Sequence, residues 1–119
     1  MEYGFEKLEI YEIAKALVLE IYKITLNFPK EEIFGLTSQV KRASVSIVLN
    51  IAEGSGRNSK KDFARFINQA VGSLFETKAS LCLGIDLGYV NIKETSNLFG
   101  KVDILFMKLI AFRNSLIKR

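Results

Sequence analysis

The sequence contains no histidine and no tryptophan, and it has only one proline and one cysteine. Without histidine there can be no Ser-His-Asp or Cys-His catalytic group. The usual zinc sites and the Glu-x-x-His pairs of di-iron bundles are excluded for the same reason, as are the helical ribonucleases that use an Arg-x4-His motif. No Walker A motif is present, because the segment from Gly54 to Gly56 lacks the required lysine and a preceding strand. We therefore expect no enzymatic activity, no metal and no cofactor.

Targeting and membrane segments are also lacking. The first residues do not show the basic start and apolar run of a signal peptide. The longest apolar run, residues 104–112, is interrupted by Lys108, and no stretch reaches the ~18 residues that a membrane span requires. The single cysteine, Cys82, has no partner for an internal disulfide. These features predict a cytoplasmic protein with no membrane partner, in which the thiol stays reduced.

Four segments with helical periodicity make up most of the chain. Its 119 residues, 49% of them hydrophobic and 25% charged, suit one globular domain over residues 1–119. Apolar residues recur at spacings of three and four in segments of about residues 5–28, 36–53, 59–88 and 91–119. Because the connections are short, successive helices should lie antiparallel. The sequence predicts an all-α fold, an up-down antiparallel four-helix bundle.

Local signals mark the ends of these segments. Pro29 should end the first helix, and we expect glycine at Gly54 or Gly56 to close the second in a left-handed conformation. Ser59 and Asn91 are placed as N-caps of the third and fourth helices, with acidic residues three positions later. Gly88 is the expected stop of the third helix.

The last helix carries more apolar surface than one bundle core uses. In addition to its core stripe, it has Ile104, Phe106, Met107 and Ile110 on other faces. A single core needs only about three positions in seven. The surplus predicts an interface between subunits.

Two polar stripes run along the second and third helices. Antiparallel packing would bring Glu53 near Arg65 and Arg42 toward Glu76, and a structural hydrogen-bonded network would explain both stripes. A ligand or metal site between the two glutamates is the alternative. Gly72 lies within the second stripe, where we expect two helices or two subunits to pass closely. The network consists of Gln39, Arg42, Ser46, Asn50, Glu53, Gln69, Ser73 and Glu76.

A basic hairpin joins the second and third helices. Its cations are Arg57, Lys60, Lys61 and Arg65, and the bundle would place them at the same end as the C-terminus. The formal charge is +4 overall and is concentrated in the rear two-thirds, since residues 1–36 hold seven acids and four bases. Such a surface is suited to contact phosphates. The alternative is a solvated basic surface, partly offset by the acids of the first helix.

Several short motifs occur in a fixed order along the chain. They are Phe28-Pro29, Glu32, Gly35-Leu36, Gln39, Arg42-Ala43, Ser46-Ile47, Asn50 to Gly54, Ala70 to Glu76 and Gly88-Tyr89. Together they resemble one known family, the four-helix-bundle proteins encoded in the intervening sequences of bacterial 23S rRNA genes. The resemblance implies a homopentamer. A related branch, the accessory variability protein of diversity-generating retroelements, is a basic pentameric barrel that partners a reverse transcriptase and binds nucleic acid.

Two functions follow as hypotheses. The first is a non-enzymatic oligomer that binds RNA or an RNA–protein assembly through the basic hairpin, mostly by phosphate contacts that weaken with salt. The second is a protein-binding scaffold oligomer without affinity for nucleic acid. Salt-dependent RNA binding distinguishes the two.

Overall fold

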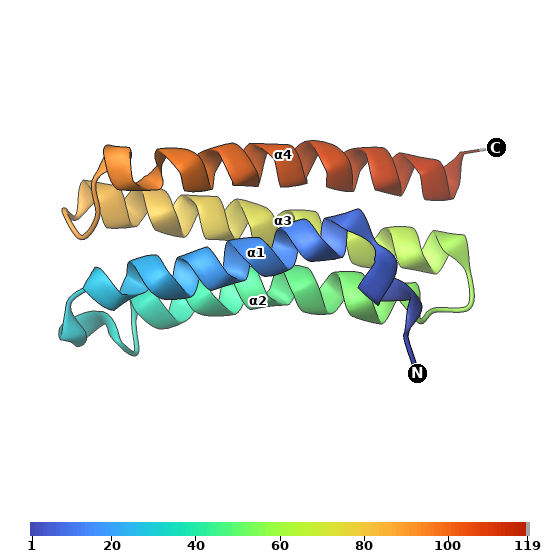
Figure 1. The fold of residues 1–119 in the computed structure, drawn as a ribbon, viewed down its shortest axis with the longest axis horizontal. Coiled ribbons are helices and arrows are strands. Elements are labelled where there is room, and N and C mark those ends of the chain that lie inside the picture. The colour runs from blue at the N-terminus through green and yellow to red at the C-terminus, as the bar shows by residue number, and fades with distance from the viewer. Residues whose placement is uncertain (119) are drawn as a thin grey trace.

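Four long helices run alternately up and down in the computed structural model, which describes residues 1–118 (Figure 1). The predicted all-α fold is confirmed: the helices lie antiparallel to their neighbours in sequence and contact one another as a bundle, α2 with α3 most closely and α1 with α4 least. The helices are α1 (Glu9–Ile24), α2 (Leu36–Ser55), α3 (Lys60–Asp86) and α4 (Ile92–Ile117), with short 3-10 turns η1 (Gly4–Lys7), η2 (Thr25–Asn27) and η3 (Lys30–Glu32).

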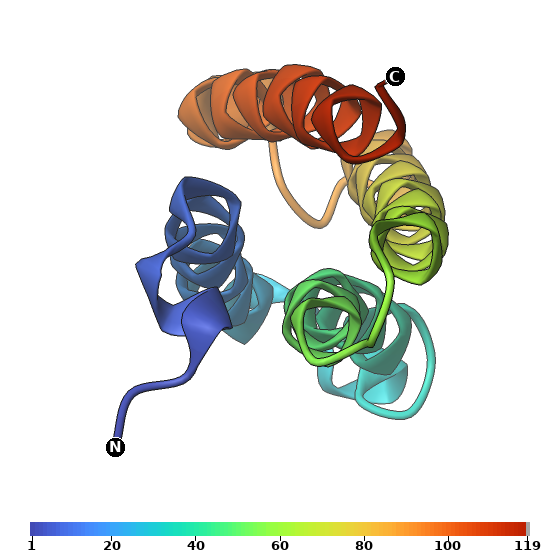
Figure 2. The ribbon, with the colours of Figure 1, turned by 90° about the vertical axis from the view of Figure 1, so that its right-hand side faces the viewer.

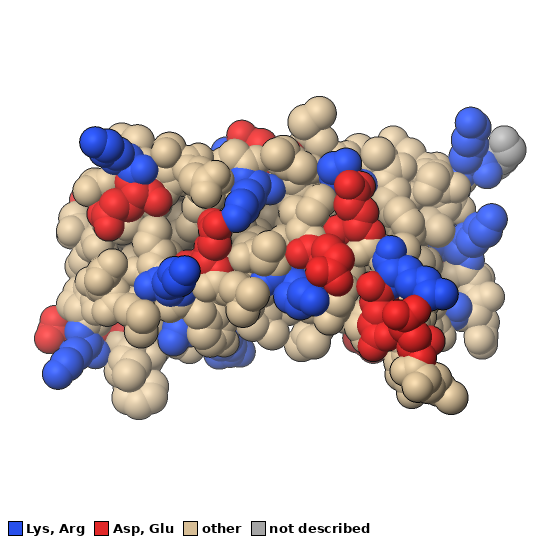
Figure 3. All heavy atoms as spheres, in the orientation of Figure 1, with Lys and Arg blue, Asp and Glu red and all other residues tan. Residues whose placement is uncertain are grey.

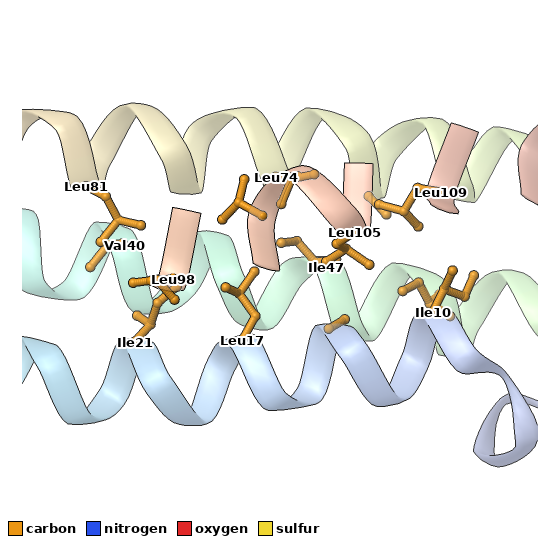
Figure 4. Packing of buried hydrophobic residues seen from close by; sticks show 14 of the residues in the cluster. Ile10, Leu17, Ile21, Val40, Ile47, Leu74, Leu81, Leu98, Leu105 and Leu109 are labelled. Carbon is orange, nitrogen blue, oxygen red and sulfur yellow. The ribbon is translucent and has the colours of Figure 1, made fainter. Parts of the chain in front are cut away.

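The core is built from the apolar stripes of all four helices. Leu17, Ile47 and Leu74, from three different helices, point toward one another near the middle of the bundle (Figure 4). Burying each such side chain stabilises the fold by about 1.5–3 kcal/mol. The buried cluster consists of Ile10, Ala14, Leu17, Ile21, Val40, Ile47, Ile51, Ile67, Ala70, Leu74, Leu81, Leu98, Val102, Leu105 and Leu109.

The first helix is shorter than its apolar pattern predicts. It begins at Glu9 rather than near residue 5, because Leu8 has an extended backbone that separates η1 from α1. The carboxylate of Glu6 accepts the backbone N–H of Tyr3 at 3.2 Å, which stabilises the 3-10 turn instead. At the other end α1 gives way to η2 ahead of Pro29, as the proline predicted.

The glycines at the end of α2 have a different role from the one expected. Gly54 lies inside the helix and is buried, and Gly56 has a φ of −89°, so neither residue adopts the left-handed conformation. A Cβ atom on Gly54 would lie 2.7 Å from the Cβ of Phe66 and 2.8 Å from Cδ1 of Phe63. The glycine is therefore required by the close approach of α3.

The expected caps of the last two helices are confirmed. The Ser59 hydroxyl accepts the Asp62 N–H at 3.0 Å. Asn91 accepts the Glu94 N–H at 2.8 Å, and the Glu94 carboxylate accepts the Asn91 N–H in return. Gly88 follows α3 with a φ of +80°, the left-handed conformation that glycine tolerates.

Gly72 does not lie between two helices of this chain. It is exposed, and a Cβ added there would meet no atom within 4 Å. The prediction of a close approach is therefore wrong within one chain, and a close approach between subunits stays a prediction.

Both chain ends lie at the same end of the bundle as the connection between α2 and α3 (Figure 1). Seen from that end, the last turns of α4 lie beside the first turns of α3, whereas the N-terminal segment lies on the opposite side (Figure 2). In residues 1–118 no helix is long and apolar enough to span a membrane. The arrangement places the predicted basic hairpin next to the end of α4.

Candidate nucleic-acid interface

The hairpin between α2 and α3 is held by a buried aromatic ring. Phe66 packs against Gly54, where the lack of a side chain lets its Cβ approach α2. The guanidinium groups of Arg57 and Arg65 each lie 4.5 Å from the centre of the Phe66 ring. Cation–π contacts of this kind order the two arginines against the end of the bundle.

The two arginines are also paired with acids. Arg57 donates to the Glu53 carboxylate at 2.9 Å, and Arg65 pairs with Asp62 at 2.8 Å. Arg57 also lies 3.8 Å from Asp62. The expected contact between Glu53 and Arg65 does not form, because each residue finds an opposite charge three or four positions away on its own chain segment.

Lys60 and Lys61 behave differently from the two arginines. Both are exposed and lie in the first turn of α3, where helix N–H groups favour anions. Neither lysine forms an ion pair with an acid of residues 1–118. These two side chains therefore supply the uncompensated charge of the hairpin.

The acids of the N-terminal segment offset the basic hairpin less than the sequence suggests. Glu9 pairs with Lys108 at 3.0 Å, and Glu2 lies 3.5 Å from Lys7. On the face in Figure 3, acidic and basic side chains alternate, and at the right-hand end basic side chains gather near the C-terminus while acids lie near the N-terminus. The uncompensated cations are thus on the side of α3 and α4.

The polar network between α2 and α3 is present in part. Ser73 donates to Ser46 at 2.9 Å, and Asn50 donates to the carbonyl and the hydroxyl of Ser46 at 2.9 and 3.1 Å. Nearer the start of α2, Gln39 donates to the Glu76 carboxylate at 3.4 Å. The Ser73–Ser46 and Gln39–Glu76 hydrogen bonds join α2 to α3 and are consistent with their antiparallel register, whereas the Asn50 bonds lie within α2.

The remaining members of the predicted network are not connected to it. Arg42 and Gln69 are exposed, and their side chains make no hydrogen bond to another residue of 1–118. In this register Arg42 lies level with Glu76, but the two form no ion pair. Glu53, the third of these members, pairs with Arg57 instead. An exposed ion pair of this kind contributes only about 0.2–1 kcal/mol to the stability of the fold.

A ligand or metal site between Glu53 and Glu76 is ruled out by the same register. Glu76 lies level with Arg42, which is eleven residues before Glu53 on α2. At 1.5 Å per residue, the two glutamates are about 16 Å apart along the bundle. Nor does any group of three or more His, Cys, Asp or Glu residues in the described part of the chain form a candidate metal site.

A hydrogen bond joins the α1–α2 loop to the α3–α4 loop at the opposite end of the bundle. The Glu32 carboxylate accepts the Leu36 N–H at 2.9 Å and the Tyr89 hydroxyl at 2.8 Å. The Tyr89 ring packs on Phe28, with ring centres 5.5 Å apart. Helical periodicity does not predict this contact because it joins residues 57 positions apart, although both residues belong to the motifs that carry the family resemblance.

The hydrogen bond between Glu32 and Tyr89 shifts the pKa values of both groups in the directions that favour the hydrogen bond. The Leu36 N–H, and then the Tyr89 hydroxyl, lower the pKa of Glu32 below its ordinary value of 4.5. The hydrogen bond to Glu32 raises the pKa of Tyr89 above 10.0. Glu32 therefore stabilises the fold above pH about 4.5 and loses this effect as pH falls through its lowered pKa, while the contribution of Tyr89 is lost as pH rises through its raised pKa.

Replacing Glu32 with glutamine should reveal this dependence. An amide resembles the protonated acid, so the wild type should be more stable than Glu32→Gln at pH 6, and the difference should shrink as the pH falls from about 4.5 through the lowered pKa of Glu32. Urea unfolding at several pH values measures it. Tyr89→Phe serves as the control, since it leaves the Leu36 N–H in place and should keep part of the acid dependence. A stability difference that does not change with pH would contradict the assignment.

Known proteins place this fold in a family. The family model described as "23S rRNA-intervening sequence protein" matches residues 6–111. A crystal structure from Bacteroides thetaiotaomicron VPI-5482, a protein of unknown function from the S23 ribosomal protein family, is similar in fold with a TM-score of 0.76 and 24% identity over 92% of this chain and 99% of that one. No curated protein matched significantly. The match to the family model over most of the bundle shows that the chain belongs to the 23S rRNA-intervening sequence protein family.

Proposed function

We propose that this protein is a non-enzymatic oligomeric module that binds RNA, alone or in an RNA–protein assembly, through the basic end of the bundle. The observation that carries the proposal is the pair of exposed lysines, Lys60 and Lys61, in the first turn of α3 without an acidic partner among residues 1–118. Lysines of this kind contact phosphates without reading the bases. The family's name is consistent with an association with RNA.

An oligomer would bind RNA more tightly through this surface than a single subunit would. One subunit has a formal charge of only +4, and a few phosphate contacts give little affinity at physiological salt. A closed ring of five subunits, as the family resemblance implies, would repeat the hairpin around one rim. Multivalent contact then raises the affinity without any new type of contact.

Exposed apolar residues on α4 support the oligomer. Ile104 is 50% exposed and Met107 is 68% exposed. On the neighbouring side of α4, an open groove of about 510 Å³ is lined mainly by apolar residues of α3 and α4, including Phe75, Val102 and Phe106. Apolar surface of this extent favours contact with another protein surface.

Light scattering at micromolar concentration should therefore give a mass several times that of the 13.4 kDa chain, with five subunits as the proposed number. Met107→Glu should reduce the mass, because it would bury a charge in the interface. Leu19→Glu, a similar change at an exposed leucine on α1, is the matched control and should leave the mass unchanged. A monomer mass for the wild type would contradict the oligomer.

The same apolar surface favours the second candidate function, a scaffold that binds protein alone. The two proposals differ in one measurement, the binding of structured RNA by the wild type at low and high salt. Binding that falls steeply with salt supports the RNA module. No binding at low salt would leave the scaffold as the remaining proposal.

A further inference from the structure

A second basic feature lies between the first turns of α3 and the last turns of α4. There the two helices lie side by side at the end of the bundle (Figure 2). They form an open groove whose polar lining residues are cations and one amide, and whose apolar lining residues are Ala64 and Ile117. The lining residues are Lys61, Ala64, Arg65, Asn68, Arg113 and Ile117.

Arg113 differs from the hairpin arginines in the groups that hold it. Its guanidinium donates to the side-chain oxygen of Asn68 at 3.0 Å and to that of Asn114 at 3.3 Å. Both acceptors are neutral, and Arg113 forms no ion pair with an acid of residues 1–118. The side chain is partly buried and held in position, so its positive charge remains available while its mobility is reduced.

Several other cations of α3 and α4 are paired with acids instead. Lys101 pairs with Glu20, Lys108 with Glu9, and Lys78 with Asp103. Because Arg113 is held by two neutral amide oxygens, no carboxylate of residues 1–118 neutralises its charge. An incoming anion could therefore bind Arg113 without displacing an acidic side chain. Lys61, Arg65 and Arg113 therefore give the groove lining a net positive charge, and Asp62 is a nearby acid already bound to Arg65.

The groups around the groove match the chemistry of a phosphate. Guanidinium and ammonium groups form charge-assisted hydrogen bonds with phosphate oxygens, roughly twice as strong as neutral ones. The Asn68 amide nitrogen makes no hydrogen bond within residues 1–118 and is a further donor, since its oxygen is the atom that accepts from Arg113. The first turn of α3, which begins at Lys60, adds the positive end of the helix dipole.

We propose that this groove binds one phosphate of the RNA backbone, held by Arg113 and Lys61 with Asn68 as the neutral donor. The inference rests on the proposed function and adds a specific site to it, next to the lysines of the hairpin. One phosphodiester in the groove would fix the position of the strand at the rim of the bundle, with Lys60 contacting the neighbouring backbone. The contact is independent of base sequence.

Arg113→Gln tests the site, because it removes the charge and keeps a side chain that can hydrogen-bond to Asn68. Filter binding of structured RNA over a range of salt should show a several-fold loss of affinity for every RNA sequence tested. The slope of log K against log salt should decrease by about one for each site engaged. Arg42→Gln is the matched control: it makes the same charge change at an exposed arginine of α2, and it should leave affinity and slope unchanged.

A second measurement identifies the ligand as an RNA phosphate. At constant ionic strength, replacing chloride with inorganic phosphate should weaken RNA binding by the wild type and have less effect on Arg113→Gln.

RNA binding that is the same for Arg113→Gln and the wild type would overturn the groove site and leave the proposed function standing. No RNA binding by the wild type would overturn the proposed function. If RNA binding were equal for Arg113→Gln and the wild type while phosphate raised the melting temperature of the wild type alone, the groove would be a site for a free anion, and the RNA assignment would be wrong.

Discussion

Replacing Gly54 with alanine should destabilise the bundle, whereas the same replacement at Gly72 should stabilise it. Alanine in a helix is favoured over glycine by about 0.5–1 kcal/mol, and at the exposed Gly72 nothing opposes that gain. At Gly54 the new methyl group would lie 2.7 Å from the Cβ of Phe66, an atom that moves only with the backbone of α3. Overpacking of this kind costs about 1–3 kcal/mol.

Urea unfolding of the two variants beside the wild type measures both effects. The substitution is identical, so the two positions differ only in their surroundings. A stabilised Gly54→Ala would contradict the close contact of α2 and α3. A strongly destabilised Gly72→Ala would instead show that a second subunit passes close to that glycine, since nothing in the single chain does.

Reversing the charges of Lys60 and Lys61 should abolish RNA binding. The Lys60→Glu/Lys61→Glu double variant changes the formal charge by −4 in every subunit and places two carboxylates where the phosphates would lie. Phosphate contacts supply most of the affinity of such a surface. Filter binding of structured RNA at two salt concentrations should show salt-sensitive binding for the wild type and none for the variant.

The melting temperature should change little in this variant, because both lysines are exposed and unpaired among residues 1–118. The Lys30→Glu/Lys93→Glu double variant is the matched control. It makes the same charge change with two exposed lysines at the opposite end of the bundle. Equal RNA binding by the hairpin variant and the wild type would remove the hairpin from the proposal, and equal loss in the control would reduce it to an effect of net charge.

Periodicity predicted the fold because each helix stripe is a local pattern whose burial does not depend on details of its partner. Ile10, Leu17 and Ile21 are buried as the spacing of α1 indicated. The caps at Ser59 and Asn91 were equally predictable, since each acts over three residues. The predicted start of α1 was wrong because the apolar spacing continues into η1, where the backbone hydrogen bonds are those of a 3-10 turn.

The candidate site was predicted less well because its contacts depend on competition in three dimensions. The four hairpin cations do lie together, but Arg57 and Arg65 are occupied by Glu53 and Asp62, and helical spacing cannot say which pairs form. The role of Gly54 depends on the ring of Phe66 from another helix. The partners of Arg113 could not be read from the sequence, since Asn68 lies 45 positions earlier.

The contact between Glu32 and Tyr89 should slow the unfolding of the bundle. It links the α1–α2 and α3–α4 loops at the end where α2 and α3 have no covalent connection, so these two helices are tied at both ends. Closing a loop of 57 residues carries an entropic cost that local helix formation does not. A contact that forms after the helices pack should act mainly on the rate of unfolding, so the Glu32–Tyr89 hydrogen bond should lengthen the lifetime of the folded state more than it speeds folding.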